Sequence, residues 1–414
     1  AWPVLSRADE PAPAGSPPAA RPVHEWGRVL TLDGQWEIAE GRGEQAPTLY
    51  PATIEVPGLV TTAEPAFAEV GVESSKRDAF WYRKKFRIEG VLPSVARLKI
   101  GKAMYGTEVY LNGRRVGASA LNFTPLYFDV SSLVRGQGQE NELVIRVGAH
   151  ISNVPDTVTS GGDPERHRYP PGIYDRVELL LSEDPYVSHV QVAPDLAHRC
   201  ARVAVDFTAQ SGSGQSLQLQ AIVREWKSGR VVGRGSIVAD RIDSGKTTHV
   251  EVTLPVDDCR LWTPDTPYLY VLALTDGRFS YETRFGMRTF AVDPEFTNRA
   301  LLNGVPCFIR GTNFAVHRFF EDEHCRHHPW EEAWVRRLFR TFRQMGMNGV
   351  RLTIGPAPEL WYDIADEEGM MIFDEYAIWY AYQPDVGDVA KEAADPHRRW
   401  GIWPKHLTAG ELEL

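Results

Sequence analysis

Alternating apolar and polar residues, interrupted by glycine, proline and asparagine, dominate the chain between residues 26 and 181. Alternation with a period of two predicts short β-strands that each have one buried face. The clearest turn is Asn112–Gly113, which follows the strand-like run 107–111 and suits the positive φ angles of a two-residue hairpin. Because no helical period separates these strands, we expect them to close on one another as a jelly-roll β-sandwich.

A second series of alternating segments begins near Tyr186. Its clearest strands are expected at residues 202–207, 217–226, 248–255 and 268–275. A stretch of about 100 residues with polar turns between such strands is typical of an immunoglobulin-like β-sandwich. This prediction rests on the number of strands, because the usual pattern of two cysteines and a tryptophan is not established.

Near Phe296 the pattern changes from a period of two to alternating strands and helices. The expected order is strand 305–313, which should be buried, helix 331–345, strand 349–354, helix 358–369 and strand 370–376. The first helix has one apolar face, made of Trp334, Leu338, Phe342 and Met345. This order implies a parallel sheet, and a (β/α)8 TIM barrel is the commonest way to close one.

The chain is therefore expected to be multidomain, mostly β at first and α/β afterwards. We divide it into a leader, a jelly roll, an immunoglobulin-like sandwich and the N-terminal part of a TIM barrel, at residues 1–24, 25–185, 186–293 and 294–414. The leader is rich in proline and alanine, which predicts disorder. Because the first residue is Ala1 and not Met, we expect a processed periplasmic or extracellular protein. A cytoplasmic location is the alternative.

Composition narrows the possible partners. A net charge of −10 argues against nucleic-acid binding, and no apolar run approaches the roughly 20 residues of a membrane span. The cysteines and the group His324, His327 and His328 lack the spacing of a zinc site, so we expect no metal or cofactor. The sequence does not decide whether Cys200 and Cys259 form a disulfide or whether the chain forms a homo-oligomer.

The active site of such a barrel lies at the carboxyl ends of its strands. The candidate polar residues at those ends are Asn313, His317, Arg351, Asp374, Glu375 and Trp379. Arg351 needs a carboxylate nearby, either as part of a site that orients a glutamate or a sugar, or as a structural pair with Asp374 or Glu375. Adjacent strand residues point to opposite faces, so at most one of these two acids faces the site.

An ordered series of motifs along nearly the whole chain resembles glycoside hydrolase family 2. The motifs are FWYRKKF (80–86), YLNGRRVG (110–117), PPGIYDRVEL (170–179), LWTPDTPYLY (261–270), RFGMRTF (284–290), LLNGVPCFIRGTN (301–313), MGMNGVRL (345–352) and DIADEEGMMIFDEY (363–376). The family includes β-galactosidases, β-glucuronidases and β-mannosidases. The resemblance implies a carbohydrate substrate, either a β-glycoside or a β-uronide, and a retaining exo-hydrolase in which two glutamates do the chemistry.

The resemblance also implies that both catalytic glutamates are missing from this chain. In the family, the acid/base Glu follows an Asn at the end of the fourth barrel strand, and the nucleophile lies near the seventh strand. The only Asn-Glu pair here is Asn141–Glu142, in the first sandwich, so we expect both glutamates downstream of Leu414 and an inactive chain. A non-catalytic carbohydrate-binding or scaffold protein is the alternative.

Departures from the family pattern limit the prediction of the substrate. Ala315 replaces a histidine that normally follows the first-strand Asn by two positions, so His317 takes over only if the loop is rearranged. Family members often place a sugar-binding Asp shortly before the Gly-Ile motif. Here Asp163 lies farther away and Arg168 nearer, which hints at an anionic sugar, although solvated loop charges explain the pattern equally well.

Overall fold

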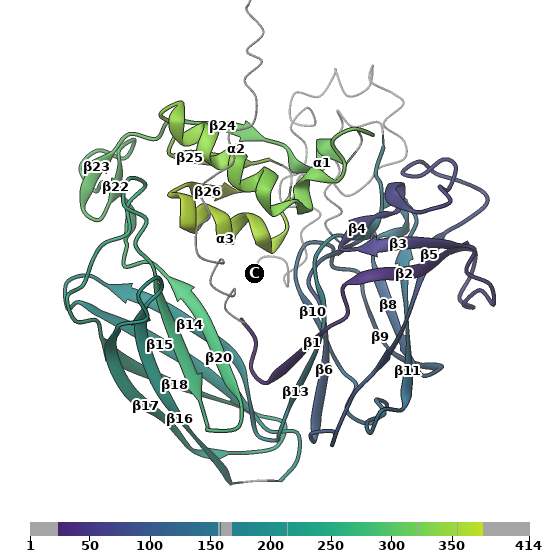
Figure 1. Cartoon of the computed structure of the whole chain (residues 1–414), viewed down its shortest axis with the longest axis horizontal. Coiled ribbons are helices and arrows are strands. Elements are labelled where there is room, and N and C mark those ends of the chain that lie inside the picture. The colour runs from purple at the N-terminus through teal and green to yellow at the C-terminus, as the bar shows by residue number, and fades with distance from the viewer. Residues whose placement is uncertain are drawn as a thin grey trace, which may run out of the picture.

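The computed structural model describes residues 24–155, 158, 168–212, 214–320, 322–353 and 355–375. Residues 1–23 of the predicted leader lie outside this part of the chain. Figure 1 shows two β-rich bodies side by side and a smaller α/β body above them. None of the helices that the structure describes is both long and apolar enough to cross a membrane.

The first body is an antiparallel sandwich. Its four-stranded sheet has the order β1 (Arg28–Thr31), β13 (Val177–Ser182), β6 (Val95–Ile100) and β10 (Leu126–Asp129). Its six-stranded sheet has the order β3 (Ala52–Val56), β2 (Gly34–Gly41), β5 (Ala79–Arg87), β11 (Glu140–Gly148), β8 (Thr107–Leu111) and β9 (Arg114–Ser119). A short sheet joins β4 (Gly58–Leu59), β12 (Gly172–Ile173) and β7 (Ala103–Met104), and two short helices, η1 (Val60–Thr62) and η2 (Ile151–Asn153), lie in the loops.

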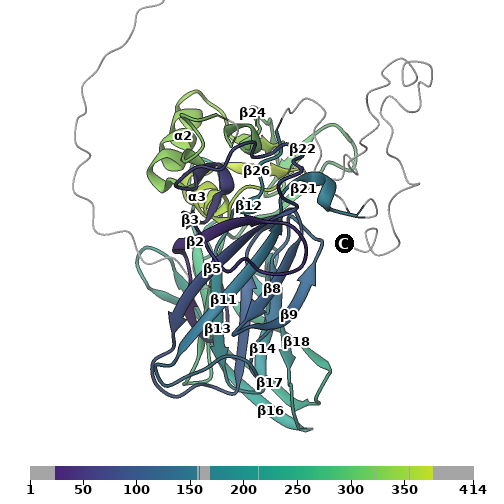
Figure 2. The same ribbon diagram turned by 90° about the vertical axis from the view of Figure 1, so that its right-hand side faces the viewer.

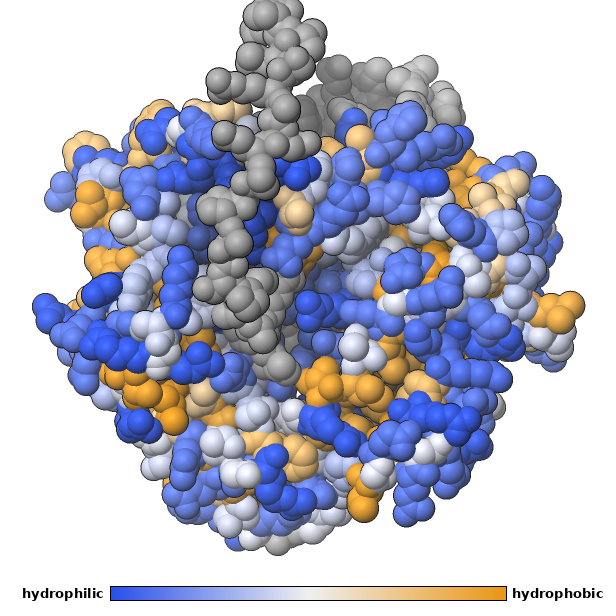
Figure 3. Space-filling model, in the orientation of Figure 1, coloured by the Kyte–Doolittle hydropathy of each residue, from blue (hydrophilic) through white to orange (hydrophobic). Residues whose placement is uncertain are grey.

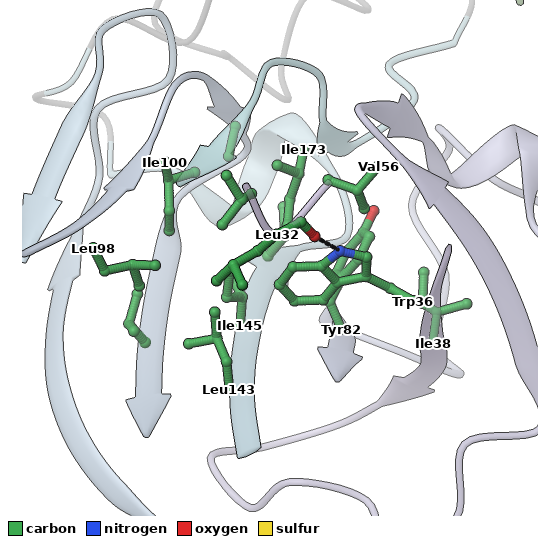
Figure 4. Packing of buried hydrophobic residues seen from close by; sticks show 14 of the residues in the cluster. Leu32, Trp36, Ile38, Val56, Tyr82, Leu98, Ile100, Leu143, Ile145 and Ile173 are labelled. Carbon is green, nitrogen blue, oxygen red and sulfur yellow. Dashed lines mark hydrogen bonds between the residues drawn. The ribbon is translucent and has the colours of Figure 1, made fainter. Parts of the chain in front are cut away.

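The core of this sandwich follows from the alternation seen in the sequence. Trp36, Ile38 and Tyr82 point inward from the six-stranded sheet, and Leu98 and Ile100 meet them from the other sheet (Figure 4). The buried indole of Trp36 donates a hydrogen bond to the carbonyl oxygen of Leu32 over 2.8 Å, so its one polar group is satisfied. The predicted β-sandwich is confirmed.

The hairpin predicted at Asn112–Gly113 is also confirmed. It joins β8 to β9, and both turn residues have positive φ, 52° and 78°. The Asn112 side chain then donates to the carbonyl oxygen of Leu133 and to Asn141, which ties the turn to the neighbouring loop.

The second body is an antiparallel sandwich with the predicted immunoglobulin-like character. One sheet has the order β14 (Tyr186–Asp195), β15 (Cys200–Thr208) and β18 (Thr247–Pro255), and the other β17 (Val231–Ile242), β16 (Gln215–Glu225), β19 (Tyr270–Thr275) and β20 (Ser280–Phe285). Val203, Phe207 and Leu272 fill the space between the sheets. All four cysteines are free thiols, so Cys200 and Cys259 form no disulfide in this structure.

The single buried strand expected at residues 305–313 is wrong. The segment forms two strands, β23 (Val305–Cys307), which completes a small antiparallel sheet with β21 (Phe290–Val292) and β22 (Ala300–Leu302), and β24 (Gly311–Phe314). The turn Asn303–Gly304, with φ of 54° and 77°, folds β23 back on β22. Both new strands are largely exposed because each forms the edge of its sheet.

The third body confirms the predicted order of strand, helix, strand, helix and strand. Its parallel sheet has the order β24, β25 (Gly349–Leu352) and β26 (Met371–Asp374). The chain passes from β24 through α1 (Val316–Phe319) and η3 (His328–Trp330) to the long helix α2 (Glu332–Gln344). It then forms β25, the second long helix α3 (Glu359–Glu368) and β26.

The two long helices cover one face of the parallel sheet. The predicted apolar face of α2 is confirmed for Trp334, Leu338 and Phe342, which pack against the core half-buried. Val335 and Phe339, which were not predicted, are fully buried, and Met345 is 65% exposed. The reason is that α2 ends at Gln344, so Met345 lies past the last helical residue as its cap.

Helix α3 fixes the parallel sheet onto both sandwiches. At its start, the backbone N–H of Glu359 donates to Asp175 of the first sandwich over 3.0 Å. Farther along, Asp363 and Glu367 form ion pairs with Arg284 of β20, whose side chain is only 3% exposed. The position of the parallel sheet therefore depends on the contacts of α3 with both β-rich bodies.

Candidate functional site

The parallel register places a set of polar side chains on the face of the sheet opposite the helices. Asn313 pairs with Arg351, and Arg351 pairs with Phe373, across the three strands. Their chain neighbours Phe314 and Leu352 belong to the core under α2 and α3. Because side chains alternate along a strand, Asn313, Arg351 and Glu375 share the other face, at the carboxyl end of the sheet.

Arg351 and Glu375 form the central contact of this face. The guanidinium Nη2 of Arg351 lies 2.8 Å from the carboxylate Oε2 of Glu375. The Arg351 side chain is 46% exposed and that of Glu375 only 10% exposed. Of the carboxylates considered for Arg351, Glu375 is thus the partner, and the arginine lies at the open end of the strand rather than in its buried interior.

Asp374 points to the other face, as the alternation of strand residues predicts. Its Oδ1 accepts a hydrogen bond from the hydroxyl of Tyr362 on α3 over 2.8 Å. Burial raises the pKa of Asp374, and the hydrogen bond from Tyr362 and the charge of Lys102 offset this only in part. Asp374 and Glu375 therefore cannot flank the same bond as a pair of glycosidase carboxylates.

His317 does not lie with Asn313 and Arg351. It is only 2% exposed and is surrounded by aromatic rings, those of Phe123 and Tyr174 from the first sandwich and Phe320 from the same loop. The segment after β24 turns into helix α1, which carries the imidazole under the loops of the first sandwich.

The other candidates lie apart from this face or outside the described residues. Arg168 is exposed on the first sandwich, close to the Gly-Ile segment that forms β12. Asp163 and Trp379 both lie outside the described residues. Among the residues that the structure does describe, no three His, Cys, Asp or Glu side chains converge as a metal-binding group.

Two positioning residues were missed by the sequence analysis. The ammonium of Lys102 lies 2.6 Å from Oδ2 of Asp175, and the same oxygen accepts the N–H of Glu359 at the start of α3. A carboxylate at a helix N-terminus is favourable because it meets unpaired N–H groups and the positive end of the helix dipole. Asp175 stands within the PPGIYDRVEL motif, but its partner on α3 could not be identified from the sequence.

Two β-sandwiches followed by a parallel α/β sheet define a class of multidomain proteins. The family model described as "Glycosyl hydrolases family 2" matches residues 186–288, and that described as "Glycosyl hydrolase 2 galactose-binding domain-like" matches residues 52–178. The chain belongs to glycoside hydrolase family 2.

The curated relatives that the chain matches are longer than this chain. A putative β-glucuronidase from Formosa agariphila is 24% identical over 330 residues, which are 76% of this chain and 29% of the relative. A β-galactosidase from Thermoanaerobacter pseudethanolicus is 26% identical over 336 residues, which are 74% of this chain and 40% of the relative. The chain thus spans less than half the length of either relative.

Solved structures share the fold. The β-glucuronidase of Bifidobacterium dentium matches with a TM-score of 0.66 and 22% identity, over 84% of this chain and 61% of that one. The β-mannosidase of Dictyoglomus thermophilum matches with a TM-score of 0.63 and 20% identity, over 90% of this chain and 50% of that one.

Proposed function

We propose that this chain holds and orients the sugar in a retaining β-glycosidase of family 2 that acts on a β-glycoside or β-uronide. The observation that carries the proposal is the polar face formed by Asn313, Arg351 and Glu375. An amide, a guanidinium and a carboxylate together offer donors and acceptors for sugar hydroxyl groups. Their position at the carboxyl ends of parallel strands is where a (β/α) barrel keeps its active site, and we propose that β24, β25 and β26 open such a barrel.

In this proposal neither catalytic glutamate is among these 414 residues. Retention requires two carboxyl groups about 5 Å apart, one as acid/base and one as nucleophile. Glu375 is paired with Arg351, and Asp374 lies on the opposite face. Asn141, the first residue of the only Asn-Glu pair, is fully buried and exchanges hydrogen bonds with the backbone of Arg135, which is a structural role.

Binding and turnover test this proposal separately. Saturation-transfer NMR should detect methyl β-glucuronide, β-galactoside or β-mannoside on the 414-residue chain, and Arg351→Ala should abolish the signal. Arg337→Ala, an exposed arginine on the helix side of the sheet, is the matched control and should leave the signal unchanged. Equal signals from both variants would contradict a role for Arg351.

The same three sugars, as 4-nitrophenyl β-glycosides, test catalysis. The chain should release no nitrophenol above the buffer rate, because the two glutamates are absent. Turnover that is lost in Glu375→Gln would show that a described carboxylate is catalytic and would overturn this part of the proposal.

A further inference from the structure

Four residues that precede the first strand, residues 24–27, lie where all three bodies meet. β1 begins at Arg28 and belongs to the first sandwich, yet Trp26 is part of the core of the second sandwich. Figure 1 shows this purple segment between the two β-rich bodies and below α3, and Figure 2 shows α3 above the strands of the first sandwich. We call residues 24–27 the strap.

His24 connects the strap to α3 and to the second sandwich. Its Nε2 lies 3.7 Å from Oδ1 of Asp363 on α3, and its Nδ1 lies 3.1 Å from the hydroxyl oxygen of Thr283 on β20. Oδ1 of Asp363 also lies 2.7 Å from the guanidinium of Arg284. The strap and β20 therefore hold α3 through the same carboxylate oxygen.

Glu25 connects the strap to the first sandwich. Its Oε1 accepts a hydrogen bond from the hydroxyl of Tyr127 on β10 over 2.8 Å and lies 2.9 Å from the ammonium of Lys99 on β6. The side chains of Glu25 and Lys99 are only 11% and 7% exposed. Because water reaches this pair poorly, its hydrogen bonds are stronger than those of an exposed pair.

Trp26 and Gly27 fit the strap against both sandwiches. Trp26 is 2% exposed, and its ring centroid lies 6.4 Å from that of Phe279. The N–H of Gly27 donates to the carbonyl oxygen of Ser280 over 3.3 Å. Gly27 has φ of 111°, and a Cβ atom there would lie 2.5 Å from the carbonyl oxygen of Leu181 on β13. Only glycine lets the strap pass this close to the first sandwich.

The strap is anchored less completely than a strand. It belongs to no sheet, so side chains rather than a ladder of backbone hydrogen bonds hold most of it. In the part of the chain that the structure describes, the buried indole N–H of Trp26 has no hydrogen-bond partner, whereas that of Trp36 has one. A buried donor without a partner offsets part of the stability gained by burying the ring. The strap should therefore leave its place more readily than a strand leaves its sheet.

The contact of the strap with α3 leads to the polar face of the parallel sheet. Asp363 is next to Tyr362 on α3, and the hydroxyl of Tyr362 donates to Asp374 on β26 over 2.8 Å. Glu375, the partner of Arg351, follows Asp374 directly. A shift of α3 would therefore carry β26 and Glu375 with it.

We propose that residues 24–27 are a conformational device, a strap that holds α3 and the parallel sheet against both sandwiches while it is seated. Release of the strap frees α3 and β26 to move, while the strands of the first sandwich keep their pairing. The device acts on the position of the Arg351–Glu375 face, and it does not depend on which ligand that face binds.

Hydrogen–deuterium exchange of the 414-residue chain tests the proposal, because it reports opening segment by segment. Trp26→Ala removes the apolar anchor and should speed exchange of the amides in α3 and β26 at least tenfold. His24→Ala removes only the contacts with Asp363 and Thr283 and should speed it at least threefold. The amides of β5 and β11, at the centre of the six-stranded sheet, should keep the parent's rate in both variants.

Each variant has a matched control. Trp81→Ala removes a fully buried tryptophan from the first sandwich and should speed exchange in β5 but not in α3. His198→Ala breaks a contact of the same kind, with Asp195 in the second sandwich, and should leave α3 unchanged. Trp26→Phe keeps an aromatic anchor without the unpaired N–H and should restore the parent's rate in α3.

Unchanged exchange of α3 in both strap variants would overturn the proposal. Equal acceleration in α3, β5 and β11 would also overturn it, because that result would show a general loss of stability. Acceleration of α3 by Trp81→Ala would have the same meaning. If Trp26→Ala does not fold, His24→Ala alone decides the outcome.

Discussion

At the scale of single residues, two arginines in similar ion pairs differ in how far water reaches them. The side chain of Arg284 is 3% exposed and is paired with Asp363 and Glu367, whereas that of Arg351 is 46% exposed. Water reaches the guanidinium of Arg351 and not that of Arg284. The same truncation should therefore have unequal effects on stability.

We expect Arg284→Ala to lower the free energy of unfolding by about 3–5 kcal/mol, because it leaves two carboxylates poorly solvated and unpaired. Arg351→Ala should cost less, because it leaves one buried carboxylate, that of Glu375, unpaired instead of two. Urea titration followed by tryptophan fluorescence measures both. Equal losses in the two variants would show that burial does not set the difference.

The pKa of Asp363 makes the contact between α3 and the second sandwich sensitive to acid. Burial alone would raise this pKa, but the hydrogen bond with His24 and the charge of Arg284 lower it to about 2. The ordinary value is 3.8, so the folded state binds this proton less readily than the unfolded chain. The resulting stability is fully present above pH 4 and is lost as the pH falls towards 2.

Asp363→Asn should remove this pH-dependent contribution to the free energy of unfolding, on the order of 2 kcal/mol. The free energy of unfolding should then change less between pH 4 and pH 2. Thermal melts across that range measure the slope. Asp240→Asn, at an exposed position on β17, serves as the control and should keep the parent's slope. An unchanged slope in Asp363→Asn would assign the acid sensitivity to other groups.

At the scale of elements, the two long helices end next to glycines in the same backbone conformation but in different surroundings. Gly346, just past the cap of α2, has φ of 78° with open space around it, and Gly369, the cap of α3, has φ of 73°. A Cβ atom on Gly369 would lie 2.1 Å from the carbonyl oxygen of Pro264 in the second sandwich. Only the second glycine is required by tertiary packing.

Gly346→Ala should therefore destabilise the chain by about 1 kcal/mol, the cost of a left-handed alanine. Gly369→Ala should cost more than about 3 kcal/mol, because α3 must also move away from the second sandwich. Differential scanning calorimetry of the two variants gives the comparison. Similar losses would mean that the loop at Pro264 yields easily.

At the scale of the whole molecule, apolar side chains gather around the small sheet β21–β23. Phe308 is 78% exposed, Val305 63% and Val292 60%. Figure 3 shows separate orange side chains at the upper left, where β22 and β23 lie in Figure 1, and further orange areas lower in the view. Exposed apolar side chains that gather in one region favour association.

Phe308→Ser should reduce self-association of the 414-residue chain at high concentration. Static light scattering measures this as a fall in apparent mass. Val91→Ser changes a side chain that is 83% exposed in a loop of the first sandwich and should have little effect. A larger effect from Val91→Ser would move the association surface away from β21–β23.

Much of the architecture follows from short-range patterns. Alternation predicted both sandwiches, because a strand of period two can bury only one face, and Asn112–Gly113 predicted a hairpin because both residues accept positive φ. Gly369 predicted the end of α3 for the same reason. The prediction for residues 305–313 was wrong, because an apolar run does not show whether it forms one buried strand or two edge strands.

The site depended on contacts that no local pattern contains. Which acid pairs with Arg351 was decided by the parallel register of β25 and β26, and burial of His317 by the loops of the first sandwich. Asp175 and Glu359 meet across 184 positions of sequence. Backbone conformation and periodicity are set by near neighbours, so the sequence by itself determined the elements. Side-chain partners are set by which distant elements pack together, so only the tertiary structure decided them.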